Sequence, residues 1–257
     1  MSHTLTILTG ASRGLGRAMA GQLLQPGHRL LTLSRRPDPT LDALAHERGA
    51  TLEQWSADLS APSEANGLLG AWLSDLASRQ AGALPARVNL VHNAALLSRP
   101  GPVEDAAAHD LSDALRVGLE APVLLTATLL RLTAGWGADR RVLFISSGLG
   151  RRAMAGSASY CATKAGLDHF ARALALDQAL PGGGGARIVS LAPGVIDTDM
   201  QVQLRGADRG AFPEGARFEE LKSSGALDAP EAAAAKVLRY LDRADFGSNV
   251  TADVRDA

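Results

Sequence analysis

The sequence has little of several features that would place it in a special class of protein. It contains one cysteine, Cys161, which excludes an internal disulfide, and its apolar runs fall short of the ~20 residues that cross a bilayer. The N-terminus lacks the charged and then apolar pattern of a secretory signal. The net charge of -1 leaves no excess of basic residues for nucleic acid. We therefore expect a cytoplasmic protein with no membrane segment and no nucleic-acid partner.

Metal ligands and base-stacking residues are also sparse. The tryptophans form no array on which bases could stack. His92, at a strand end, is interpreted as a buried ring, and Cys161 as a packing residue, because a helix would turn its side chain about 100° from Tyr160. The histidines lack the spacing of metal ligands, so no metal site is expected at His3, His28, His46, His92, His109 or His169.

The chain does contain an alternation of two kinds of segment, in a composition typical of globular proteins. Short apolar runs rich in β-branched residues or leucine predict buried strands at Thr4–Leu8, Arg29–Ser34, Thr51–Ser56, Val88–His92, Val142–Ser146 and Ile188–Ala192. Stretches rich in alanine, leucine and charge predict helices at Arg17–Gln25, Glu64–Arg79, Val123–Thr133 and Tyr160–Leu180. This alternation predicts an α/β fold, a Rossmann-type, doubly wound parallel sheet with helices on both faces.

Length alone leaves one or two domains open, but the alternation continues without a break and favours one domain over residues 1–257. The glycine run Gly182–Gly185 is interpreted as a turn that ends a helix rather than as a linker. The segment from Gln201 to Gly225 is polar and glycine-rich, and it is either a surface excursion or a substrate lid. Its place after a strand end favours a lid at about residues 200–225.

A glycine-rich turn follows the first predicted strand. Glycines at 10, 14 and 16 allow a tight turn, a close approach of the backbone to a pyrophosphate, and packing of the next helix on the sheet. A purely structural turn is the alternative, and the context of strand, turn and helix favours the dinucleotide. The expected contacts in this turn are Gly10, Ser12, Arg13, Gly14, Leu15 and Gly16.

The end of the second predicted strand indicates which dinucleotide binds. NAD-binding proteins usually end this strand with a carboxylate for the ribose hydroxyls, whereas this chain has Ser34 followed by Arg35. Arg35 and Arg13 offer planar cations suited to a 2'-phosphate, although a solvated basic patch would look the same. The nearest carboxylate, Asp38, follows a proline that turns the chain away. The sequence therefore favours NADP(H).

Tyr160 and Lys164 are four residues apart, on one face of a predicted helix. An ammonium group near the phenol should lower the pKa of Tyr160 from about 10 toward the working pH. The spacing alone is common and carries little weight. Ser147, at the end of a strand that points to the same edge of the sheet, could bind the substrate oxygen that Tyr160 protonates.

Together these motifs make the chain resemble the short-chain dehydrogenase/reductases over almost its whole length. The resemblance adds Asp58, Asn93-Ala94-Ala95, and Pro193-Gly194 to the motifs above. It implies that Asp58 contacts the adenine and that Asn93 braces the central strands. At the nicotinamide end, Val195 and Thr198 would hold the carboxamide near Pro193 and Gly194. Lys164 would also bind the nicotinamide ribose. Hydride would pass from NADPH to a carbonyl carbon, with catalytic residues Ser147, Tyr160 and Lys164.

Two positions depart from the family pattern. Ala95 replaces the usual glycine at a packing position. Gly118 stands where the family has the asparagine of its proton relay, although the main-chain carbonyl that holds much of the relay water is retained. We expect slower or differently gated proton supply rather than loss of activity.

Within the family, the stretch from Ala192 to Gln201 together with Leu221–Gly225 is similar to sepiapterin reductases and bacterial benzil reductases. That likeness implies a diketone or another carbonyl beside an oxygenated carbon as substrate. The expected substrate contacts are Ser147, Leu149, Met154, Met200 and Asp253. Asp253 would anchor a pterin ring by analogy with the sepiapterin reductases, or it would simply close the last strand.

Two other functions remain open at this stage. One is an NADP-dependent alcohol dehydrogenase working oxidatively, and the other is a protein that senses NADPH without turnover. Intact Ser147, Tyr160 and Lys164 argue against a sensor, which needs no proton donor. The resemblance further implies a homodimer or homotetramer formed through helices at Gly118–Ala134 and Ser157–Leu180.

Overall fold

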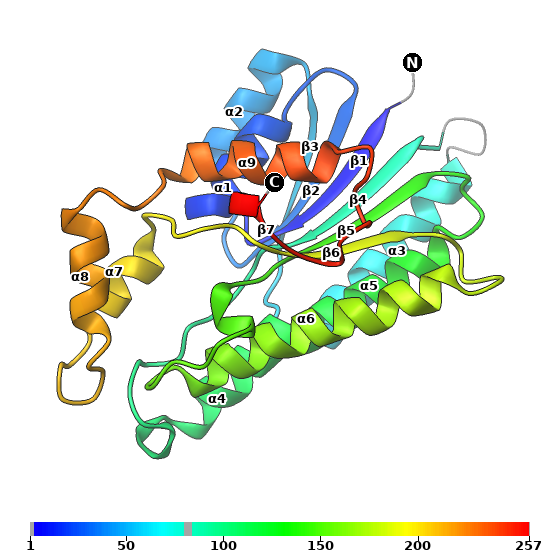
Figure 1. The fold of residues 1–257 in the computed structure, drawn as a ribbon. Helices are drawn as coiled ribbons and strands as arrows, with labels where there is room; N and C mark the ends of the chain where they lie inside the picture. The colour runs from blue at the N-terminus through cyan, green and yellow to red at the C-terminus, as the bar shows by residue number, and fades with distance from the viewer. Residues whose placement is uncertain (1–2, 80–83, 257) are drawn as a thin grey trace.

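A parallel sheet forms the centre of the protein in the computed structural model, which describes residues 3–79 and 84–256 (Figure 1). Within these residues the sheet has seven strands, and every neighbouring pair is parallel. Across the sheet the strands are β3 (Thr51–Ser56), β2 (His28–Ser34), β1 (Thr4–Thr9), β4 (Arg87–His92), β5 (Asp139–Ile145), β6 (Arg187–Ala192) and β7 (Thr251–Asp253). The strand order reverses between β1 and β4, where ligands bind in such sheets.

Helices cover both faces of the sheet, as the alternation predicts. Figure 1 shows α1, α2 and α9 on one face and α3, α5 and α6 on the other. The first face buries one apolar cluster, which includes Met19 and Val237, and the second buries another, which includes Leu69 and Leu125. These helices are α1 (Gly14–Leu23), α2 (Pro39–Arg48), α3 (Pro62–Arg79), α5 (Ala121–Leu132), α6 (Ala158–Ala179) and α9 (Pro230–Asp242).

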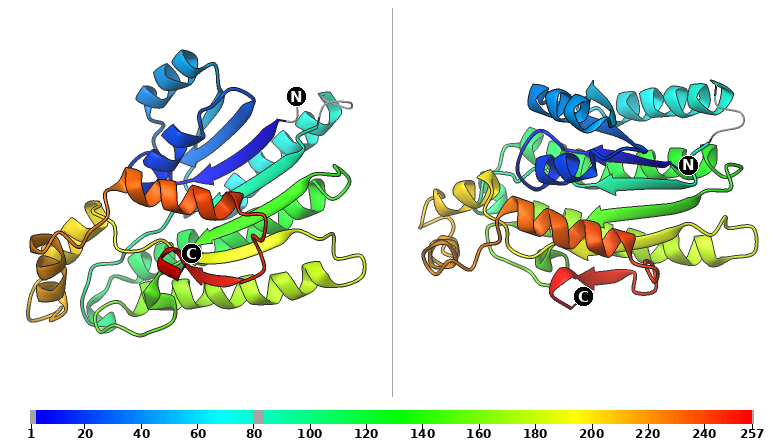
Figure 2. Two further views of the ribbon diagram at one scale, coloured as in Figure 1. Left: turned by 45° about the horizontal axis from the view of Figure 1, so that its top comes forward. Right: turned by 90° about the horizontal axis from the view of Figure 1, so that it is seen from above.

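Two short helices lie beyond the carboxyl ends of the strands. Helices α7 (Asp199–Arg205) and α8 (Gly215–Ser223) lie next to one another there, where Figures 1 and 2 show them apart from the two main layers. They account for much of the segment for which the sequence predicts a lid. On the other side of the same edge, α4 (Ala108–Leu115) packs against α6.

The predicted fold class is confirmed, and the predicted strands and helices agree with the structure to within a few residues. Gly182, Gly184 and Gly185 have positive φ angles between α6 and β6, as expected for a turn. The largest disagreement among the strands concerns β5, which begins at Asp139 rather than at Val142.

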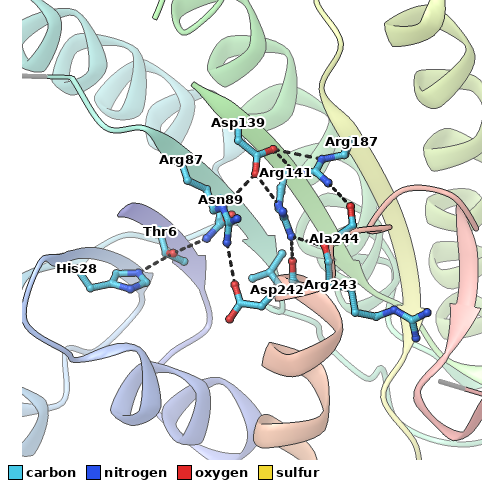
Figure 3. Close-up of polar contacts among 11 residues, drawn as sticks. Thr6, His28, Arg87, Asn89, Asp139, Arg141, Arg187, Asp242, Arg243 and Ala244 are labelled. Atoms are coloured by element: carbon cyan, nitrogen blue, oxygen red, sulfur yellow. Dashed lines mark hydrogen bonds and ion pairs between the residues drawn. The ribbon is translucent and has the colours of Figure 1, made fainter. Parts of the chain in front are cut away.

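A polar network explains the early start of β5. Arg141 is 2% exposed, and it donates to Asp139 and to the carbonyl oxygens of Leu241 and Arg243 at the end of α9 (Figure 3). Arg187 on β6 donates to the same carboxylate at 2.6 Å. The last carbonyls of a helix have no intrahelical donors, so these guanidinium groups satisfy them. The network therefore holds the end of α9 against the sheet edge opposite the ligand-binding edge.

Candidate active site

The glycine turn between β1 and α1 can be built only with glycine at two of its positions. A Cβ on Gly10, whose φ is +74°, would lie 2.9 Å from Cα of Ala94, and a Cβ on Gly16 would lie 2.0 Å from the Gly10 carbonyl oxygen. Helix α1 begins at Gly14 without a side-chain cap at its N-terminus. Its first amides are therefore free of a competing side chain and fit the phosphates of a dinucleotide.

Asn93 braces this turn against β4. Its side-chain amide donates to the carbonyl oxygens of Thr9 at 3.1 Å and Gly10 at 3.0 Å, and its main-chain amide donates to the Thr9 hydroxyl. The bracing role that the family resemblance implies is thus present in the geometry.

Ser34, Arg35 and Asp58 lie at the adenosine end of the candidate cofactor site. The Ser34 hydroxyl accepts a hydrogen bond from the amide of Ala11 at 2.9 Å, so the residue that replaces the usual carboxylate supports the turn. Two hydrogen bonds from Ser60 lower the pKa of Asp58, and the positive charge of the nearby Arg35 lowers it further. Arg35 itself is exposed and accessible to a phosphate.

The segment after β6 approaches the glycine turn from the other side. It contains Pro193, Gly194, Val195 and Thr198, the expected contacts of the nicotinamide end. A Cβ on Gly14 would lie 3.2 Å from Cγ2 of Thr198, so the two segments are in close contact.

Ser147, Tyr160 and Lys164 come together at the carboxyl edge of the sheet. Ser147 follows β5, and its hydroxyl lies close enough to Tyr160 to favour the phenolate by hydrogen bonding. Lys164 is buried, and its Nζ lies 5.5 Å from the centre of the Tyr160 ring. The structure therefore brings together the three residues that the sequence predicts to be catalytic.

The electrostatics of Tyr160 differ from the prediction. Burial raises the pKa of Tyr160 to about 12, and the Ser147 hydroxyl only partly opposes this. Lys164 donates to the carbonyl oxygen of Ile145 at 2.8 Å. The expected lowering of the Tyr160 pKa by Lys164 is wrong for this geometry, because the loss of water around the phenol dominates and Lys164 is not among the groups that shift this pKa.

An apolar cluster lies beside the catalytic residues. Three expected substrate contacts, Leu149, Met154 and Met200, belong to it and join the loop after β5 to α7. Phe212 is fully buried in the cluster and stacks on Phe218 of α8. Cys161 packs in this cluster, as expected. The other members were not predicted to be substrate contacts, although four of them are the isolated apolar residues of the predicted lid: Leu97, Ala207, and the four isolated residues Leu204, Phe212, Phe218 and Leu221.

Comparison with known proteins agrees with this geometry. The family model for "short chain dehydrogenase" matches residues 4–209. The chain belongs to the short-chain dehydrogenase family. The family consists of oxidoreductases that use NAD(H) or NADP(H) as cofactor.

Two curated relatives and one solved structure illustrate the likeness. Benzil reductase ((S)-benzoin forming) of Bacillus cereus is 32% identical in an alignment that covers 93% of this chain and 94% of the relative. Sepiapterin reductase of Bos taurus is 34% identical in an alignment that covers 100% of this chain and 96% of the relative. A short-chain dehydrogenase/reductase structure from Burkholderia vietnamiensis is 35% identical with a TM-score of 0.63, covering 99% and 98% of the two chains.

Gly118, the position where the sequence resemblance places the family's relay asparagine, lies in a crowded part of the structure. It lies in a π-helical turn, Arg116–Glu120, between α4 and α5. A Cβ there would come within 3.0 Å of Cβ and Cγ2 of Thr163, the residue before Lys164. A side chain at position 118 would therefore require Thr163 to shift. The expected change in proton supply stays a prediction.

Asp253, at the end of β7, forms an ion pair with Arg255, two residues later in the chain. Its carboxylate accepts from the Arg255 guanidinium at 2.8 and 2.6 Å and from the Arg255 amide at 2.9 Å. These hydrogen bonds lower the pKa of Asp253. The pairing favours the structural interpretation of Asp253 over a pterin anchor.

A cavity of about 630 Å³ lies beside α7 and adjoins the apolar cluster at Leu97. Its lining is mostly polar and consists of Leu97, Arg99, Pro100, Asp110, Gln203, Gly206, Ala207 and Asp208. Because these residues are not the catalytic ones, we do not assign the reacting carbonyl to this cavity.

Two further properties of residues 3–79 and 84–256 bear on function. They contain no group of three or more His, Cys, Asp or Glu side chains that could hold a metal ion. Among the described helices, none combines the length and the apolar character that crossing a membrane requires.

Proposed function

We propose that the protein reduces a ketone to an alcohol with NADPH. The observation that carries this proposal is the meeting of Ser147, Tyr160 and Lys164 beside a dinucleotide turn. When bound, NADPH supplies the hydride. Ser147 then orients the carbonyl oxygen, Tyr160 gives it a proton, and Lys164 holds the nicotinamide ribose.

The protonation state of Tyr160 supports the reductive direction. With its pKa raised to about 12, the phenol keeps its proton at pH 7, which is the form that a general acid needs. Oxidation of an alcohol would need the phenolate instead. Tyr160 is therefore in the protonation state that the reductive reaction requires.

The preference for NADPH over NADH rests on charges at the end of β2. Arg35 is exposed beside Asp58, and the β2 end itself has a serine in place of a carboxylate. Asp38, the nearest carboxylate that could repel a 2'-phosphate, accepts from Arg17 and Thr40 and caps α2. Arg35 and Arg13 are the proposed phosphate ligands.

We assign a diketone or an α-oxygenated carbonyl as substrate class. The two curated relatives are named as benzil and sepiapterin reductases, and both names describe such carbonyls. The apolar cluster that includes Leu149, Met154 and Met200 suits an aromatic substituent next to the reacting carbon. The 200–225 segment would then act as the substrate lid of a single catalytic domain.

We also propose that the protein forms a homo-oligomer and is located in the cytoplasm. Exposed Leu176 and Leu180 at the end of α6 are consistent with burial in a homodimer or homotetramer. A single cysteine suits the reducing cytoplasm.

A substrate panel tests the proposed function. Purified protein is mixed with NADPH or NADH and with benzil, other diketones, sepiapterin or steroid ketones, and loss of absorbance at 340 nm is followed. We expect turnover of a diketone or α-oxygenated carbonyl, with kcat/KM at least tenfold higher with NADPH. Failure of every carbonyl under these conditions would contradict the proposal.

A further inference from the structure

Asp168 is a buried carboxylate to which neither the sequence nor the proposed mechanism assigns a role. It lies on α6, one helical turn after Lys164, and is 1% exposed. Its Oδ1 accepts from the hydroxyls of Ser146 and Ser190, each at 2.6 Å, and its Oδ2 accepts from Nε of Arg151 at 3.3 Å. One carboxylate thus joins α6 to the end of β5, to β6 and to the loop after β5.

Two of these donors lie on either side of Ser147 in the chain. Ser146 immediately precedes it, and Arg151 follows four residues later and also donates to the Ala252 carbonyl. The loop between them presses on α6, because a Cβ on Gly150 would lie 2.9 Å from both Oδ2 of Asp168 and the Lys164 carbonyl oxygen. Asp168 therefore fixes the segment that carries Ser147 against the helix that carries Tyr160 and Lys164.

The charge of Asp168 acts on Lys164 as well. Burial lowers the pKa of Lys164 to about 8, and Asp168 is the group that opposes this. The other titratable groups beside this pair are Tyr160 on the same helix, Arg151 from the loop after β5, and Asp253 of β7, which interacts with Arg151. β5 and β6 contribute the Ile145 carbonyl and two serine hydroxyls.

We propose that Asp168 is a positioning residue for the reduction: its carboxylate holds the segment that carries Ser147 against the helix that carries Tyr160 and Lys164. The proposal rests on the proposed function for its kinetic consequence but not for its electrostatic one. A buried carboxylate that only stabilises the fold would change the melting temperature without changing the titration of Lys164 or the rate of a folded variant.

The chain offers a direct measurement, because it has only three lysines, Lys164, Lys222 and Lys236. Their side-chain signals in lysine-labelled protein can be assigned with Lys222→Arg and Lys236→Arg variants and followed by NMR against pH. In Asp168→Asn, we expect the Lys164 midpoint to fall by about one to two pH units, because the nearby negative charge is removed. Asp168→Glu should restore most of the shift, and an unchanged Lys164 midpoint in a folded Asp168→Asn protein would overturn the electrostatic role.

A second pair of variants tests the positioning role and does not depend on Asp168→Asn being stable. Ser146→Ala deletes one donor to Asp168 next to Ser147, and we expect kcat to fall at least fivefold, with the KM for NADPH nearly unchanged. Thr133→Val deletes an equally buried hydroxyl that donates to the Leu129 carbonyl at the end of α5, and it should lower only the melting temperature.

Equal kcat values in these two variants and the unmutated protein would show that the Asp168 contacts only stabilise the fold. The NMR titration needs no substrate. An unmutated protein without ketone reductase activity would therefore contradict the proposed function, while the Lys164 midpoint would still decide the electrostatic effect of Asp168 on Lys164.

Discussion

Arg13 of the glycine turn forms an ion pair with Asp199, the first residue of α7, at 3.0 Å. Both side chains are about two-thirds exposed, at 68% and 69%, so the pair is weak and can exchange with another anion. The pair connects the proposed cofactor site to the proposed lid. A phosphate group of the cofactor and the Asp199 carboxylate would compete for the same guanidinium.

This competition predicts the effect of Asp199→Asn. Removing the carboxylate frees Arg13 and reduces repulsion of the cofactor, so the Kd for NADPH should fall roughly twofold to fivefold, the range of an exposed pair. Fluorescence titration at low and high salt measures it, and the gain should shrink at high salt. Glu219→Gln, which removes an exposed charge from α8, is the control and should change little. An unchanged Kd at low salt would mean that Arg13 is not a cofactor ligand.

Arg35→Asp tests the cofactor preference. A carboxylate at this position would repel the 2'-phosphate, and we expect a shift from NADPH toward NADH of about tenfold to a hundredfold in affinity. Arg36→Asp introduces the same charge one residue later and should have a smaller effect. Equal Kd values for the two cofactors in the unmutated protein would rule out the preference itself.

Much of the fold follows from local patterns in the sequence. The apolar runs of the central strands predict a parallel sheet, and the structure confirms it because these strands are buried on both faces. The start of β5 could not be predicted, since Asp139 and Arg141 have the composition of a loop. They belong to the strand only because distant residues of α9 and β6 pair with them.

The candidate site was predictable where it depends on short motifs. The glycine turn and the Tyr160/Lys164 pair carry their spacing in the sequence. Asp168 continues that spacing by four more residues, so the sequence also places it on the same face of the helix. The burial of the Tyr160 phenol depends on tertiary packing around α6, which the spacing does not show, so the spacing alone suggested the wrong direction for the pKa of Tyr160.

His92 predicts how stability depends on pH. Burial lowers the pKa of His92 from 6.5 to about 3. Between these two pH values His92 is protonated in the unfolded chain and neutral in the folded protein. The free energy of unfolding should therefore fall as the pH falls, by up to about 1.4 kcal/mol per pH unit for this group. Urea unfolding between pH 6.5 and 4.5 measures how the free energy of unfolding changes with pH. This interval lies above the pH range in which protonation of the paired aspartates destabilises the fold.

The matched variant for this prediction is His92→Asn, which should remove the contribution of His92 to the slope of the free energy of unfolding against pH. The pKa of His28 is also lowered by burial, so a smaller slope should remain. An identical slope in the variant would show that His92 is protonated in the folded protein.

Asp253→Asn distinguishes a pterin anchor from a structural aspartate. Because Arg255 already occupies the carboxylate, we expect benzil and sepiapterin reduction to suffer alike and the melting temperature to fall. Arg255→Gln should reproduce this pattern. A rise of tenfold or more in the KM for sepiapterin alone would instead identify Asp253 as a substrate ligand, since unpaired ring donors cost ~1 to 3 kcal/mol.

The most direct test of the account is the rate of NADPH oxidation by Tyr160→Phe with the best carbonyl substrate of the unmutated protein. Loss of a general acid lowers kcat by about 10²- to 10⁴-fold, while the Kd for NADPH should stay nearly unchanged because the ring is retained. Stopped-flow absorbance at 340 nm with saturating cofactor gives kcat, and fluorescence titration gives Kd. A variant that binds NADPH and loses turnover by at least a hundredfold agrees with Tyr160 as the proton donor, and a variant that keeps the unmutated kcat contradicts it.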